Sequence, residues 1–148
     1  MKLFDVARRA ISGLAVCFAL GVSGMMAQHS GKDQVTVILL SQRHIIERLD
    51  GKEAGATVEV VTIEPGQQDS AHRHTGPVFG YVLEGEYEHA IDDQPVKTYK
   101  AGDTFYEPSG CVHRVAQNPS SKTRTRLLAV ILHPRDAKEA TIRETAGE

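Results

Sequence analysis

The sequence of 148 residues contains no tryptophan and only two cysteines, and aromatic residues make up just 5% of it. One of the cysteines, Cys17, lies in an N-terminal segment that we expect to be removed, which leaves Cys111 as the single thiol. A lone cysteine cannot form an internal disulfide, so a small disulfide-stapled scaffold is excluded. The fold must instead be stabilised by a hydrophobic core. A chain of this length typically forms one domain.

An excess of basic charge is also lacking. The 17 lysines and arginines are outnumbered by 19 acidic residues, and the net charge is −2. Nucleic-acid-binding domains commonly carry a basic patch or stripe, and none is visible here, so we expect no nucleic-acid partner. Hydrophobic residues make up 41% and charged residues 24% of the chain, which is typical of globular proteins.

The only long apolar run lies near the N-terminus, between Ala10 and Val22. It follows three basic residues, Lys2, Arg8 and Arg9. This arrangement is typical of a secretory signal peptide over residues 1–27, cut after Ala27, with a cut after Gly24 as the competing site. We therefore expect a periplasmic or secreted protein with no stable membrane span after processing.

Two alternatives for this segment stay open. An uncleaved membrane anchor is the first, although the apolar run is shorter than a typical membrane span. Twin-arginine export is the second, since Arg8 and Arg9 are adjacent, but the flanking residues match that signal only weakly.

Hydrophobicity in the remaining chain alternates mostly with a period of two, which predicts strands. The predicted strands are Val35–Leu40, Thr57–Glu64, Val78–Leu83, Glu86–Ile91, Val96–Tyr99, Thr104–Tyr106, Val112–Ala116 and Arg126–Leu132. Short strands separated by glycine, proline and asparagine turns indicate an all-β, antiparallel sandwich or barrel. Only Arg43–Leu49 and a segment near the C-terminus, Arg135–Thr145, favour a helix, and the latter is expected to form a minor one.

Three of the seven histidines are spaced as metal ligands would be, whereas His29, His44 and His133 are expected to face solvent. His72 and His74 are two residues apart, so on an extended strand both imidazoles project from the same face. His113 follows a Pro-x-Gly turn that reverses the chain before the next strand, and antiparallel pairing can bring it to the first two. Three nitrogen donors could then converge on one ion.

These segments resemble the two signature motifs of the cupin superfamily. The first motif matches at Gly66, His72, His74 and Gly85, and the second matches at Gly102, Pro108, Gly110 and His113. The resemblance implies that residues 28–148 form a single cupin β-barrel domain, a double-stranded β-helix or jelly roll, with its core at about residues 57–132. It further implies one divalent metal ion, which could be iron, manganese, zinc or nickel, held by His72, His74 and His113.

The sequence departs from the family pattern at the acidic metal ligand, whose position is occupied by Val78. It therefore looks like the three-histidine cupins, which include cysteine dioxygenase-like enzymes. Another residue could replace the acid instead, and none of the candidates has the family spacing. These candidates are Gln68, Glu84, His89 and Glu107. Cys111 is expected to be an inert, buried thiol, with a ligand role as the alternative.

Three functions follow as hypotheses. The first is a metal-dependent enzyme acting on a small molecule, with dioxygenase-type oxidation as the leading reaction and a lyase also compatible. The second is a cupin that binds a metal or a small ligand without turnover, and the third is a barrel that has lost its metal. The resemblance also implies a homodimer, with Val35–Leu40 as the contact because it is apolar on both faces.

Overall fold

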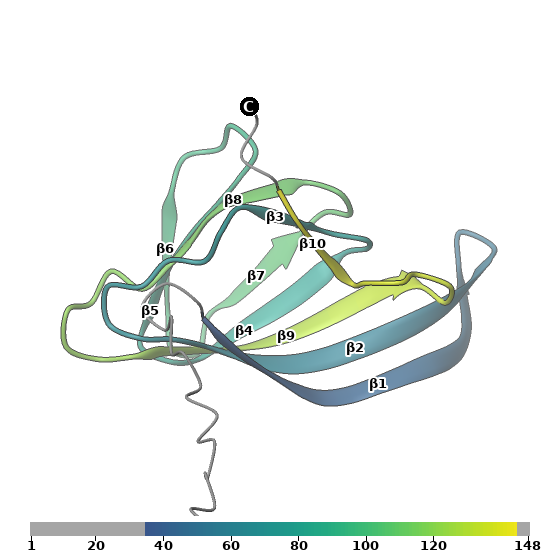
Figure 1. The fold of residues 1–148 in the computed structure, drawn as a ribbon, viewed down its shortest axis with the longest axis horizontal. Helices are drawn as coiled ribbons and strands as arrows, with labels where there is room; N and C mark the ends of the chain where they lie inside the picture. Colours follow the sequence, from purple (N-terminus) through teal and green to yellow (C-terminus); the bar gives the residue numbers. More distant parts are fainter. Residues whose placement is uncertain (1–34, 145–148) are drawn as a thin grey trace, which may run out of the picture.

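The computed structural model describes residues 35–144, which form two antiparallel five-stranded sheets facing each other (Figure 1). The strands are β1 (Thr36–Leu49), β2 (Lys52–Ile63), β3 (His72–His74), β4 (Val78–Glu84), β5 (Glu86–Ile91), β6 (Lys97–Lys100), β7 (Thr104–Glu107), β8 (Val112–Gln117), β9 (Thr125–Pro134) and β10 (Thr141–Arg143). One sheet has the order β1-β2-β9-β4-β7 and the other β10-β3-β8-β5-β6. The predicted signal peptide lies outside the described residues.

All eight strands predicted from the alternating pattern are present, and the all-β fold is confirmed. Buried residues alternate with more exposed ones throughout β9 and over residues 78–83 of β4, as expected for strands with one face in the core. The predicted helix at Arg135–Thr145 is wrong: residues 35–144 contain no helix, and Thr141–Arg143 forms β10 against β3. No helix of this part of the chain is long and apolar enough to span a membrane.

The helical alternative for Arg43–Leu49 is also wrong, because this segment continues β1. A two-residue turn joins β1 to β2, with Asp50 at φ 50° and Gly51 at φ 71° between the paired residues Leu49 and Lys52. Two positive φ angles are typical of the type I′ turn, whose twist matches that of the flanking strands. The hairpin pairs most of this segment with β2, apart from a register shift between Ile45 and Arg48.

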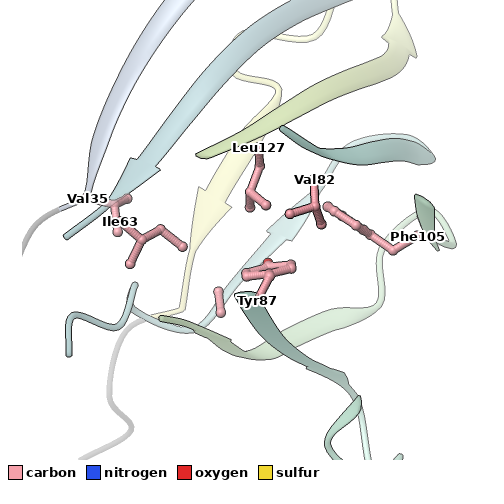
Figure 2. Close-up of a cluster of buried hydrophobic side chains, with 7 residues drawn as sticks. Val35, Ile63, Val82, Tyr87, Phe105 and Leu127 are labelled. Carbon is pink, nitrogen blue, oxygen red and sulfur yellow. The ribbon is translucent and has the colours of Figure 1, made fainter. Parts of the chain in front are cut away.

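The main hydrophobic core fills one end of the space between the sheets. Figure 2 shows Val82 and Leu127 facing Tyr87 and Phe105, with Ile63 beside them. Tyr87 is 2% exposed, and its ring packs 5.2 Å from that of Phe105, measured between centroids. The ring of Tyr87 belongs to this core, whereas its hydroxyl group contacts His113. The core therefore fixes the position of one contact of the polar site described below.

Candidate metal centre

The three predicted histidines lie together on adjacent strands of one sheet. His72 and His74 occupy both ends of β3 and are 6% and 9% exposed. His113 on β8 is the direct register partner of His72. Their donor nitrogens all lie within 4.8 Å of one another. The convergence expected from the sequence spacing is therefore present in the fold.

One nitrogen of each ring is held by a neighbouring polar group. His72 Nδ1 lies 2.8 Å from the Ser70 carbonyl oxygen, and His74 Nδ1 lies 3.1 Å from Thr141 Oγ1. His113 Nε2 lies 3.0 Å from the Tyr87 hydroxyl. When each of these nitrogens donates its hydrogen, the opposite nitrogen is left with a lone pair. Metal-ligating histidines are commonly oriented by such contacts.

The remaining nitrogens face one another. His72 Nε2 and His113 Nδ1 are 3.2 Å apart. Two lone pairs cannot face each other at this distance without a proton or a cation between them. Burial lowers the pKa of His113 to about 3 and also lowers the pKa of His74. Both rings are therefore neutral near pH 7, the form in which imidazole binds metals.

A buried carboxylate completes this cluster. Glu107, at the end of β7, is 2% exposed. Its Oε1 lies 3.2 Å from His89 Nε2 and 3.3 Å from His113 Nδ1, and its Oε2 lies 3.4 Å from His74 Nε2. Burial acts to raise the pKa of Glu107, but the hydrogen bond from His89 and the neighbouring histidines outweigh it and lower that pKa. The carboxyl group is therefore ionised at neutral pH.

Of the four residues considered as replacements for the missing acid, only Glu107 and His89 lie in this cluster. Glu84 forms an exposed ion pair with Arg124, and Gln68 forms a backbone bridge with Gln117. Sequence spacing could not identify Glu107, because its position depends on the pairing of β7 with β4, where it is opposite Val78.

The cluster forms one wall of a 270 Å³ cavity between the sheets. Most of the other lining residues are apolar and include Val61, Ile63, Val78, Phe105 and Leu127. Glu59 of β2 also lines the cavity, and burial raises the pKa of its carboxyl group. At the cavity wall, Arg143 of β10 donates a 2.8 Å hydrogen bond to Asp69. The cavity thus combines ionisable groups with a largely apolar surface and is sized for a small molecule.

Two residues outside the histidine cluster, His133 and Cys111, can be compared with what the sequence predicted for them. His133 was expected at the surface, but it is 5% exposed, and its Nε2 lies 3.0 Å from the Thr57 hydroxyl, so that expectation is wrong. Cys111 is partly exposed, and burial raises the pKa of its thiol to about 11. A thiol with such a pKa is protonated at neutral pH and a poor nucleophile.

Comparison with known proteins gives a consistent result for the fold. The family model described as a cupin domain matches residues 59–131. A double-stranded β-helix protein from Klebsiella pneumoniae is 22% identical, covering 78% of this chain and 89% of its own, with a TM-score of 0.59. No curated protein matches the sequence.

Two similar solved structures are enzymes by their descriptions. The DMSP lyase DddQ from Ruegeria pomeroyi is 23% identical over 63% of this chain and 45% of its own, with a TM-score of 0.53. An oxalate oxidase is 20% identical over 60% of this chain and 45% of its own, with a TM-score of 0.51. At such low sequence identities, the similarity shows a shared fold alone. Any inference about activity must be supported by the arrangement of side chains in this chain.

Proposed function

Because the chain belongs to the cupin superfamily, we propose that it is an exported cupin that binds one divalent metal ion and acts on a small molecule in its barrel. The proposed ligands are His72, His74 and His113. The observation that supports this most directly is the buried convergence of three imidazoles whose opposite nitrogens are each held by another group. Imidazole suits iron, zinc and nickel, and the additional carboxylate is compatible with manganese.

The spacing of the His72 and His113 nitrogens fits a shared metal ion. Ligands about 2.0–2.2 Å from an ion stand about 3.3–3.6 Å apart at tetrahedral angles and about 2.8–3.1 Å apart at right angles. The 3.2 Å between His72 Nε2 and His113 Nδ1 lies between these values. Little movement of His72 and His113 is therefore needed for both to bind one ion.

Each part of the cavity has a role in the proposed reaction. A bound metal ion would act as a Lewis acid, or would supply oxygen chemistry if it is iron. The apolar walls hold the body of a small molecule and exclude water. Glu59 is the group placed to accept or donate a proton, since no hydrogen bond or ion pair between residues 35 and 144 occupies its carboxyl group.

We propose dioxygenase-type oxidation as the reaction, because a three-histidine centre leaves positions open on the cavity side. Similarity in fold to an oxalate oxidase and a DMSP lyase supports small-molecule chemistry in such a barrel. Binding without turnover is the alternative that the test below distinguishes.

The test begins with mature protein recovered from the periplasm or the medium, without chelator or affinity nickel. We expect its N-terminus near Gln28 and about one equivalent of iron, manganese, zinc or nickel by elemental analysis. Oxygen uptake is then measured against a panel of small organic acids. Uptake that depends on the metal supports an oxidase or dioxygenase, whereas metal and ligand binding without turnover supports the binding function. Absence of metal after anaerobic reconstitution would contradict the proposal.

We also propose a homodimer formed through β1, which among the described strands pairs only with β2 and lies at the edge of its sheet. Four consecutive apolar residues, Val37 to Leu40, are each 47–56% exposed, so both faces of this strand present apolar surface. Ile38→Lys should convert the dimer to a monomer, measured by light scattering after gel filtration. Val96→Lys, at a similarly exposed apolar residue away from β1, is the control and should remain a dimer. A wild-type monomer would contradict this proposal.

A further inference from the structure

We infer that Glu107, at the end of β7, supplies an anionic oxygen ligand to the metal centre in place of the acid that the family pattern has at Val78 on β4. This inference rests on the proposed metal-binding function and extends its ligand set from three residues to four. The replacement comes from a neighbouring strand rather than from a neighbouring position in the sequence.

The sheet register brings the two positions together. Val78 and Glu107 are direct partners in the antiparallel pair formed by β4 and β7. Both are almost completely buried, at 1% and 2% exposed, and both line the same cavity. A carboxylate on β7 can therefore enter the space that a carboxylate at Val78 would occupy.

Glu107 lies close enough to two of the three histidines to share an ion with them. Oε2 lies 3.4 Å from His74 Nε2, and Oε1 lies 3.3 Å from His113 Nδ1. The separation between Oε2 and His74 Nε2 matches the edge of a tetrahedron around an ion at about 2.0–2.2 Å from each ligand, and the contact of Oε1 places the same carboxylate beside His113. The nitrogens concerned are the ones that Thr141 and Tyr87 leave free.

The two carboxylate oxygens differ in their partners. Oε1 accepts a hydrogen bond from His89 Nε2. Oε2 is the one buried side-chain polar atom in the described part of the chain that has no hydrogen-bond partner. A buried acceptor without a partner is costly, and a charged one especially so. A cation between Oε2 and the histidines would remove this cost, so we assign His89 as a positioning residue that aims Oε2 at the ion.

The carboxylate also balances charge. Three neutral imidazoles would leave a divalent ion with its full charge in a largely apolar cavity, where an uncompensated charge is unfavourable. One carboxylate reduces the net charge of the centre by one. The centre then resembles the usual cupin ligand set in charge, although its acid comes from a different strand.

The test is a Co²⁺ titration of the metal-free mature protein, followed by visible d–d absorption and by competition with a chelator. Glu107→Gln preserves the shape of the side chain and removes its charge. We expect it to weaken Co²⁺ binding by about 100-fold and to change the absorption band of the saturated complex. Glu84→Gln, in an exposed ion pair, is the matched control and should change neither.

Affinity alone would not distinguish a ligand from a residue that orients one, because losing an orienting contact typically costs about 10–100-fold. The visible absorption band of the saturated Co²⁺ complex distinguishes the two cases, since only a change in the atoms bound to Co²⁺ alters that band substantially. The double variant Val78→Glu/Glu107→Val moves the carboxylate to the family position. We expect the double variant to recover Co²⁺ affinity to within about 10-fold of wild type. If Glu107→Gln does not fold, the affinity of the double variant still tests whether a carboxylate is needed at this place in the cavity.

An unchanged band in saturated Glu107→Gln, or no recovery in the double variant, would overturn the assignment of Glu107. The three-histidine site would stand in that case, provided that wild type binds Co²⁺ and His72→Ala does not. If wild type itself binds no Co²⁺, the proposed function fails along with this inference. The two failures are therefore distinguishable.

Discussion

His72→Ala is expected to remove the bound metal while leaving the barrel folded. Loss of a ligand should cost more than the roughly 100-fold typical of losing a contact that orients one. His72 lies on the three-residue strand β3 and is not a member of the hydrophobic core cluster, so truncation should affect the fold little. The measurement is metal content by elemental analysis beside far-UV circular dichroism.

His44→Ala is the matched control for this experiment. His44 lies on the exposed part of β1 and outside the histidine cluster, so its removal should leave one equivalent of metal bound. Retention of a full equivalent in His72→Ala would show that the ion, if present, is held elsewhere. Loss of metal in both variants would point to a general effect on stability instead.

Gly76→Ala is expected to destabilise the fold by about 3 kcal/mol or more. A Cβ at this position would lie 1.6 Å from the Leu132 carbonyl oxygen and 2.7 Å from its carbonyl carbon. These are backbone atoms, which cannot rotate away. On either side, Thr75 N donates to the Ala140 carbonyl and Leu132 N donates to the Pro77 carbonyl, each at 3.0 Å. The connection between β3 and β4 would have to separate from β9.

Denaturant unfolding of Gly76→Ala beside Gly51→Ala tests this expectation. Gly51 lies in the β1–β2 turn at φ 71°, and a Cβ there meets nothing within 4 Å. The control therefore measures the cost of a positive φ alone, about 1 kcal/mol. Equal destabilisation of the two variants would contradict the steric argument. Because Gly76 follows His74 closely, we also expect weaker metal binding in any Gly76→Ala protein that folds.

Local pattern predicted much of this architecture. The alternation of apolar residues predicted the strands, since one face of each lies against the core and the other does not. The His-x-His spacing predicted a shared face for His72 and His74, because side chains two apart on a strand project in the same direction. Both inferences depend only on the backbone geometry of single segments.

Errors arose where another segment decides the conformation. Thr141–Arg143 is polar enough for a surface helix, but it forms a strand because the edge of β3 offers it hydrogen-bond partners. Arg43–Leu49 likewise extends β1 because β2 pairs with it beyond the turn. His133 was expected at the surface, but packing against β2 buries it beside Thr57. Tertiary contacts override local propensity in each case.

The sequence by itself determined the strand pattern, the three converging histidines and the absence of an acid at Val78. Only the tertiary structure decided which carboxylate reaches the histidines. Glu107 is distant in sequence from His72 and His74, and its place depends on the register between β4 and β7. That register is set by side-chain packing and by hydrogen bonds between strands, which no spacing within one segment records.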